Sequence, residues 1–222
     1  MIDVMEIVMS IEVKTTRKCS YCKDKIILET GNFVIYKDNV YYHYDCFISF
    51  MNSKKRNKLS QDEIMDMIKE SKEKNSDKVK YIIDKNHFER YLQRRYDIPC
   101  LPKSIYTRLE QIFNGTYKNL SEPISPSDLF DMWKRKEDYL EKTNQWKIDK
   151  GEGISDGIAR FFYDLAILLT KLDSYKKWKM SQEINVRTKQ NIIEENKSKI
   201  DYTKMYNNNK EKINIENILE EI

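Results

Sequence analysis

The chain has few of the residues that interrupt helices and few of those that most often carry acid–base chemistry. Its 222 residues include 5 glycines, 4 prolines and 2 histidines, while 34% are charged and 40% are hydrophobic. This composition favours a mainly α-helical soluble protein with few strands. The sequence contains no phosphate-cradling glycine loop, no Gly-x-Ser-x-Gly motif and no His-Glu-x-x-His motif.

Long apolar runs are also missing. The most apolar stretch, residues 161–172, contains Asp164 and Lys171 and is far shorter than the roughly 20 residues that a membrane-spanning helix needs. Residues 1–14 are acidic where a secretory leader would be basic, and their alternating apolar pattern predicts a strand. We therefore expect a cytoplasmic protein that does not enter a membrane.

Only four cysteines occur, and three of them share a closely spaced pattern with a histidine. Cys19 and Cys22 form a Cys-x2-Cys pair, and His43 and Cys46 form a His-x2-Cys pair after a gap of twenty residues. Tetrahedral Zn²⁺ sites are built from thiolate and imidazole ligands in such short-spaced pairs. The pattern predicts a Cys3His zinc site. The alternative interpretations are chance spacing and disulfide formation.

The ligand count also predicts what the metal does. Four protein ligands leave no vacant position for water, so the zinc should be structural, and the N-terminal module should unfold without it. Cys100 is the only cysteine outside the pattern, so no pair remains for a disulfide. This favours a reducing compartment.

The residues around the four ligands predict a local structure that would bring the ligands together. Residues 33–36 and 40–42 are β-prone runs around a polar turn, which predicts a hairpin that ends at His43. Asp45 is placed to cap a following helix, with Cys46 in its first turn. A Cys-x2-Cys knuckle, a hairpin and a helix together make a treble-clef-like unit. The apolar side of the predicted helix consists of Phe47, Ile48, Phe50 and Met51.

This stretch resembles two zinc-finger families over about residues 15–52. The ligand spacing is similar to that of the first half of a LIM domain, while residues 42–47, Tyr-His-Tyr-Asp-Cys-Phe, resemble the end of the poly(ADP-ribose) polymerase-type finger. The first resemblance implies protein contacts and the second implies binding of broken DNA ends. The second half of a LIM domain is missing here, and the gap before His43 is shorter than in the polymerase-type pattern.

Helical periodicity dominates the rest of the chain. A capping box of Ser60 and Glu63 predicts a helix over about 61–74, and an interruption is expected at residues 74–77 before one broken or two successive helices that reach Tyr96. Asn114-Gly115 predicts one helix end, and Ser125-Pro126 predicts a helix start. The later helices are expected at about 103–113, 126–144 and 155–180.

These elements predict three parts: a zinc-binding module with its N-terminal strand (1–53), an α-helical domain (54–182) and a flexible polar tail (183–222). The end of the tail could form an amphipathic helix that docks on a protein partner or on the core. A coding bias toward isoleucine explains that pattern equally well. The residues concerned are Ile213, Ile215, Ile218, Leu219 and Ile222.

Positive charge is concentrated in residues 54–110, which contain 15 Lys and Arg against 10 Asp and Glu. Residues 87–113 within this segment have the outline of a helix-turn-helix, which predicts contacts with DNA or RNA. Solvation of a charged helix face is the simpler interpretation. The expected nucleic-acid-binding residues are Lys54, Lys55, Arg56, Lys58, Arg90, Arg94, Arg95, Lys103, Arg108 and Gln111.

Catalysis has little support. One histidine is assigned to zinc, His87 has the character of an exposed helix residue, and no sequence motif places a base beside Cys100. We expect a non-enzymatic, zinc-containing protein that binds nucleic acid and has a regulatory role. The alternative is a protein–protein adaptor that uses the zinc module and the amphipathic end of the tail.

Overall fold

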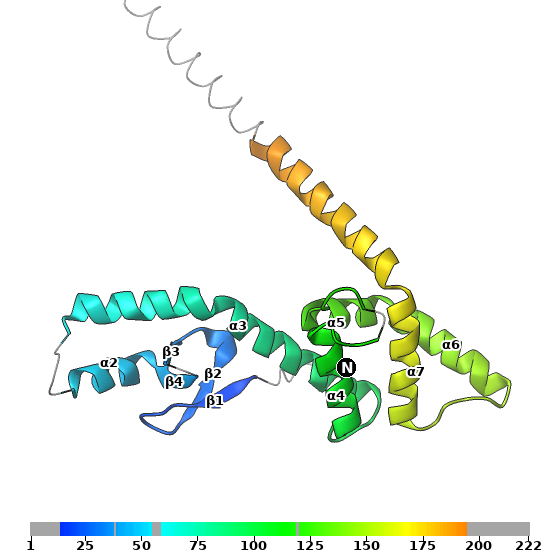
Figure 1. Cartoon of the computed structure of the whole chain (residues 1–222), viewed down its shortest axis with the longest axis horizontal. Coiled ribbons are helices and arrows are strands. Elements are labelled where there is room, and N and C mark those ends of the chain that lie inside the picture. Colours follow the sequence, from blue (N-terminus) through cyan, green and yellow to red (C-terminus); the bar gives the residue numbers. More distant parts are fainter. Residues whose placement is uncertain (1–13, 38, 55–58, 119, 195–222) are drawn as a thin grey trace, which may run out of the picture. The chain divides into compact units, whose positions relative to one another are not determined.

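The computed structural model describes residues 14–37, 39–54, 59–118 and 120–194 (Figure 1). The chain divides into two compact units, residues 1–165 and 166–222. The mainly α-helical fold is confirmed, with the strands of the described residues in the N-terminal part. The predicted strand within residues 1–14 and the amphipathic tail end lie outside the described residues. The expected domain boundaries at 53 and 182 stay predictions.

Two antiparallel hairpins and a short helix form the N-terminal module. The hairpin predicted to end at His43 is confirmed, and its turn residues Lys37 and Asn39 take left-handed φ angles of 44° and 73°. The other hairpin was not predicted, because its strands are three residues long. The elements are β1 (Thr16–Lys18), β2 (Lys25–Ile27), the 3-10 helix η1 (Leu28–Thr30), β3 (Phe33–Tyr36), β4 (Val40–His43) and α2 (Tyr44–Asn52).

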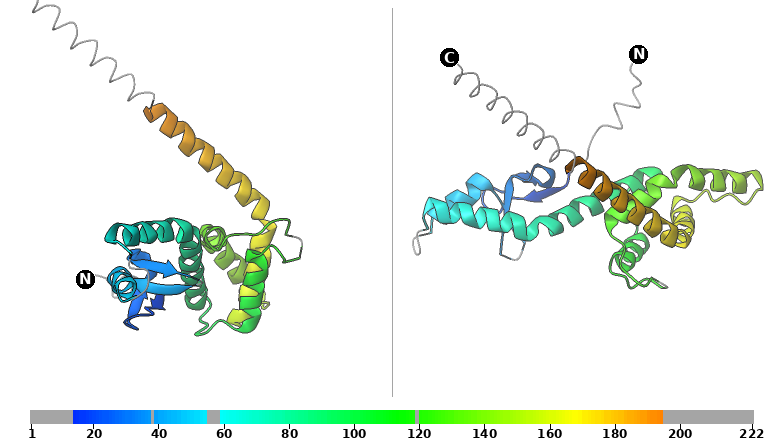
Figure 2. Two further views of the ribbon diagram at one scale, coloured as in Figure 1. Left: turned by 60° about the vertical axis from the view of Figure 1, so that its left-hand side comes forward. Right: turned by 90° about the horizontal axis from the view of Figure 1, so that it is seen from above.

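The longest element of the described residues is α3 (Gln61–Arg95), which packs against both the N-terminal module and the helical part of residues 1–165. It starts at the predicted capping box, in which Glu63 N donates to Ser60 Oγ and Ser60 N donates to Glu63 Oε2. It packs on η1 and β3 of the N-terminal module, and its last turns pack on α5 (Figure 2). One helix therefore carries the chain from the first core to the second.

The interruption predicted at residues 74–77 was wrong, because α3 is continuous there. Asn75 donates its side-chain amide to the carbonyl of Ser71 at 2.8 Å and so stays within the helix. The Ser71 hydroxyl in turn donates to the carbonyl of Ile35 and accepts from its N–H. This contact with β3 outweighs the weak helix propensity of the polar segment.

For the later helices, the predicted first residues agree with the structure better than the predicted last residues. Ser125 Oγ accepts from Asp128 N at 3.1 Å and Pro126 begins its helix, as expected. The single helix expected over 126–144 is two, because Lys136 leaves helical geometry with a φ of −105° and a ψ of 7°. The elements are α4 (Lys103–Phe113), α5 (Pro126–Arg135), α6 (Glu137–Asp149) and α7 (Gly157–Thr170).

A turn at Lys171 ends α7, and residues 172–194 are helical. The helical structure therefore passes residue 183, where the sequence predicted a flexible tail to begin. Strong helix formers such as Glu, Gln, Lys and Arg within 182–194 account for this. Within the residues that the structure describes, no helix combines the length and the apolar character needed to cross a membrane.

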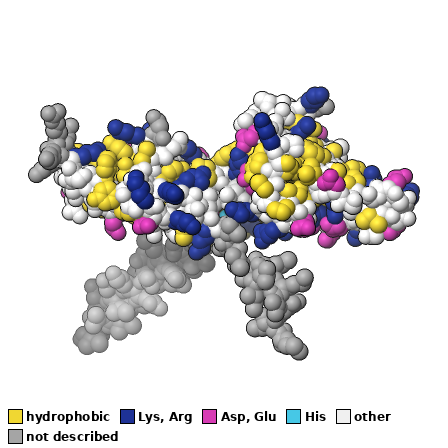
Figure 3. Space-filling model, turned by 90° about the horizontal axis from the view of Figure 1, so that it is seen from below, with side chains coloured by type: hydrophobic (Ala, Val, Ile, Leu, Met, Phe, Trp, Pro, Cys, Tyr) yellow, Lys and Arg dark blue, Asp and Glu magenta, His cyan; other side chains and the backbone are white. Residues whose placement is uncertain are grey.

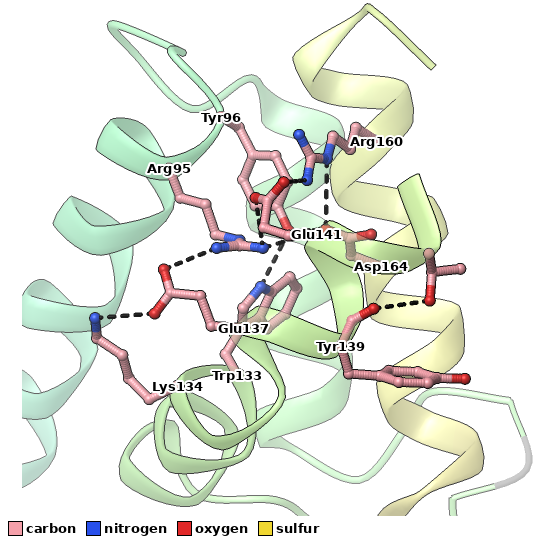
Figure 4. A network of polar contacts seen from close by, with 10 residues as sticks. Arg95, Tyr96, Trp133, Lys134, Glu137, Tyr139, Glu141, Arg160 and Asp164 are labelled. Carbon is pink, nitrogen blue, oxygen red and sulfur yellow. Dashed lines mark hydrogen bonds and ion pairs between the residues drawn. The ribbon is translucent and has the colours of Figure 1, made fainter. Parts of the chain in front are cut away.

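Trp133 is the centre of the core that α3, α5 and α7 build within residues 1–165. Its fully buried ring stacks on Phe161, with 5.5 Å between ring centroids, and packs against Phe88. The indole N–H donates to the Tyr96 hydroxyl at 3.0 Å, and that hydroxyl donates to the Asp164 carboxylate at 2.7 Å (Figure 4). A buried polar chain thus fixes how these helices meet.

Removal of the Tyr96 hydroxyl should destabilise this core. Tyr96→Phe keeps the ring but leaves the Trp133 indole and the Asp164 carboxylate without this partner, so the free energy of unfolding should fall by about 1–3 kcal/mol. Urea denaturation followed by circular dichroism measures the change. Tyr139→Phe alters a tyrosine that is 48% exposed and should change stability by less than about 0.5 kcal/mol. Equal stability of the two variants would contradict the role of the network.

Candidate metal centre

The four predicted ligands come together at one point in the structure. Donor atoms of Cys19, Cys22, His43 and Cys46 all lie within 4.8 Å of one another. His43 Nδ1 is 3.4 Å from Cys22 Sγ and 3.8 Å from Cys46 Sγ. Zn–S and Zn–N bonds of about 2.3 and 2.0 Å at tetrahedral angles would place sulfur and nitrogen about 3.5 Å apart. The donor atoms are therefore close enough to bind one metal ion, which is consistent with zinc.

The turn between β1 and β2 holds the first pair of ligands. Cys19 N donates to the carbonyl of Asp24 at 2.8 Å, and Lys23 N donates to the carbonyl of Cys19 at 3.0 Å. Lys23 takes a left-handed φ of 68°, which closes the turn. The backbone bonds thus form the tight knuckle that the Cys-x2-Cys spacing predicts.

The junction of β4 and α2 holds the second pair. His43 is the last residue of β4 and the N-cap of α2, and Cys46 lies in the first turn as predicted. His43 Nε2 is 3.3 Å from the carbonyl of Lys25. A proton on Nε2 that is donated to this carbonyl leaves the Nδ1 lone pair for a metal.

Asp45 does not cap α2, which corrects the prediction. The N-cap is His43 and makes no side-chain cap bond, while Asp45 lies within the first turn. A carboxylate in that position still favours the helix, since it faces the positive end of the helix dipole.

The electrostatics of the cluster favour a bound cation. Burial raises the pKa of Cys19, but hydrogen bonds from the backbone of Cys22, His43 and Tyr21 outweigh it and lower this pKa to about 6. Burial, together with the neighbouring sulfur atoms of Cys22 and Cys19, raises the pKa of Cys46 to about 12. One thiolate thus opposes ionisation of the next, and a divalent cation removes that repulsion.

A small apolar core supports the cluster. Phe47 and Met51 of α2 are buried, and the ring of Tyr42 stacks on that of Phe50 with 5.1 Å between centroids. The core continues into α3 through Ile64 and other residues of its first half. A bound metal would add to the stability that this small core provides.

Arg95 does not contribute to an accessible nucleic-acid surface, which corrects its predicted role. Its side chain is 6% exposed, and its guanidinium lies 2.8 Å from Glu137, 3.2 Å from Glu141 and 4.0 Å from Asp164 (Figure 4). A buried guanidinium held by carboxylates is not available to phosphate groups. Arg95 instead belongs to the polar network beneath Trp133.

Other predicted contact residues fall into different surroundings. Arg90, Arg94 and Lys103 are exposed. Arg108 is half-buried, with its guanidinium 4.7 Å from the centroid of the Tyr117 ring. Gln111 is also half-buried, and Lys54 lies over the Phe50 ring. Lys55, Arg56 and Lys58 lie outside the described residues.

The helix-turn-helix prediction is not supported. The seven residues 96–102 join α3 to α4, whereas the motif uses a turn of three or four. Just before residue 87, where the predicted motif begins, Lys85 of α3 forms an ion pair with Glu110 of α4. This ion pair offsets part of the positive charge.

One hollow beside the metal centre is lined by Arg17, Lys18 and Lys78, for which the sequence predicted no role. Lys18 directly precedes the ligand Cys19. Its adjacency to Cys19 was a usable signal. The contribution of Lys78 was not readable, because it depends on how α3 packs against the module.

Comparisons with known proteins leave the metal centre without a relative. No family model matches the chain, and neither a curated protein nor a solved structure matches it significantly. The LIM-like and polymerase-type resemblances are therefore unconfirmed, and the site rests on its own geometry.

Loss of one ligand should release the metal and unfold the module. Cys22→Ser or Cys46→Ser should lower the zinc content from one per chain toward zero and disorder residues 14–52, while most of the helical circular dichroism remains. Elemental analysis of the purified protein gives the metal content. Cys100→Ser changes an exposed free cysteine outside the cluster and should retain the metal. Unchanged metal content in the ligand variants would contradict the assignment.

Proposed function

We propose that the protein binds nucleic acid through the surface of its zinc module and the adjoining part of α3, without catalysing a reaction. Charge is the observation that supports this most. Residues 14–54 contain 7 Lys and Arg against 4 Asp and Glu. Figure 3 shows Lys and Arg side chains spread over the face it draws. The exposed cations of the module are Lys14, Arg17, Lys18, Lys23, Lys25 and Lys37.

The metal explains why such a surface would have a fixed shape. Arg17, Lys18, Lys23 and Lys25 all lie on the β1–β2 hairpin, whose turn carries two of the four ligands. Bound zinc would hold this hairpin against β4, since the other ligand pair follows that strand. Cations on a rigid frame lose less entropy when they bind phosphates than cations on a flexible loop.

The end of α3 extends the charged surface. Arg90 and Arg94 are both exposed and lie four residues apart, so they share one face of the helix. The Nε of Arg94 donates to the carbonyl of Arg90 at 3.4 Å, which leaves the outer nitrogens of its guanidinium for a ligand. This spacing suits successive contacts along a phosphate backbone.

A second candidate function is protein binding, which an apolar groove between β3 and α3 favours. Phe33 and Ile35 line it on one side, and Val79 and Ile83 line it on the other. A partner would place an apolar side chain there. The predicted contribution of the tail end lies outside the described residues. Affinity for nucleic acid falls steeply with salt, whereas affinity in an apolar groove changes little.

Replacement of the two exposed arginines should weaken nucleic-acid binding and its dependence on salt. Arg90→Ala with Arg94→Ala should make the slope of log affinity against log salt shallower by roughly one to two, since about that number of phosphate contacts is lost. Fluorescence anisotropy over a salt titration measures the slope, and circular dichroism should show an unchanged fold.

Arg135→Ala is the matched control, because Arg135 is exposed on α5 and forms an ion pair with Asp131. It should leave the slope unchanged. If the metal-loaded protein binds neither duplex, nicked nor single-stranded nucleic acid at low salt, the proposal fails and the adaptor function replaces it.

A further inference from the structure

A hollow of about 520 Å³ opens beside the metal centre. Lys18 and Ser20, which flank the ligand Cys19, line one side of it. Asn39 and Tyr41 come from the β3–β4 hairpin, and Lys78 comes from α3. Segments that are far apart in the sequence therefore meet around one space.

Cations surround the opening of this hollow. Arg17, Lys18 and Lys78 are exposed, and among the described residues that line it there is no acidic side chain. The Lys78 ammonium donates to the side-chain oxygen of Asn39, which holds it over the hairpin turn. An ammonium has three donors, so two remain for a ligand. The opening is suited to an anion with several acceptor oxygens.

Two of the residues that line the hollow are apolar. Tyr41 is 6% exposed and Ile82 is half-buried, so the hollow also has an aromatic and an aliphatic wall. The volume lies within the range of about 300–1,000 Å³ that is usual for sites of organic ligands. It exceeds what an inorganic phosphate would fill. The lining fits a ligand that joins an anionic group to a flat apolar one.

We infer that the hollow holds one unpaired nucleotide of a nucleic-acid strand, with its phosphate at Arg17, Lys18 and Lys78 and its base or sugar against Tyr41 and Ile82. Paired bases are stacked inside a duplex and cannot enter a hollow without being extruded, whereas a single strand offers them freely. The inference rests on the proposed function and narrows it to single-stranded nucleic acid.

The metal centre and the hollow are mechanically connected. Ser20 N donates to the carbonyl of Tyr41 at 2.8 Å, which joins the knuckle to β4. Cys19 lies between Lys18 and Ser20, and His43 lies two residues after Tyr41. Loss of zinc would therefore separate the two walls of the hollow and remove nucleotide binding together with the fold of the module.

The test compares variants of α3 and β1 for binding of a labelled oligothymidylate, measured by anisotropy at low salt. Lys78→Gln removes a cation of the hollow, and Arg17→Gln removes another from β1. Each should weaken binding by roughly fivefold to tenfold. Lys80→Gln, two residues along the same helix but lining the other groove, should change binding by less than about twofold. Lys78→Arg should restore most of the affinity.

The variants should keep the metal content and circular dichroism of the parent protein. If Lys78→Gln does not fold, the affinity of Arg17→Gln tests the inference instead. If Lys80→Gln weakened oligothymidylate binding as much as Lys78→Gln and Arg17→Gln do, the inference would be overturned. The proposal that the protein binds nucleic acid would still stand. Equal affinity for a duplex of the same length would overturn the inference too. Failure of the parent protein to bind any nucleic acid would instead overturn the proposed function and the inference with it.

Discussion

The convergence of three thiols and one imidazole on a single point is the constraint on which the rest of the molecule depends. The module that contains them has strands of three and four residues and a small apolar core, which alone gives little stability. Coordination of a divalent ion would add to this stability and would fix two hairpins against one helix. Bound metal would therefore give the basic surface on these hairpins a defined shape.

Helix α3 connects the module that holds the four ligands to the second core of the chain. Its first half closes the core of the zinc module, and its last turns place Tyr96 under Trp133 and Asp164. Because one rigid helix enters both cores, its exposed side chains keep a fixed distance from the knuckle. That continuity lets Lys78 complete the hollow and places Arg90 and Arg94 on the helix that packs against the module.

The features that sequence predicted well are those determined by neighbouring residues. Ligand spacing located the metal site, the polar turn located the hairpin that ends at His43, and the Ser60 capping box located the start of α3. The features it missed depend on distant contacts. Ser71 keeps α3 continuous through a bond to a residue 36 positions away, and carboxylates at least 42 positions away bury Arg95. Charge patterns show how many cations a segment has, but not which of them face solvent.

The most direct test of the account is X-ray absorption at the zinc edge of the purified, metal-loaded protein. The account predicts one zinc per chain, with about three sulfur atoms at about 2.3 Å and about one nitrogen at about 2.0 Å. A first shell made only of oxygen and nitrogen, or a shell with an exchangeable water in place of one ligand, would contradict it.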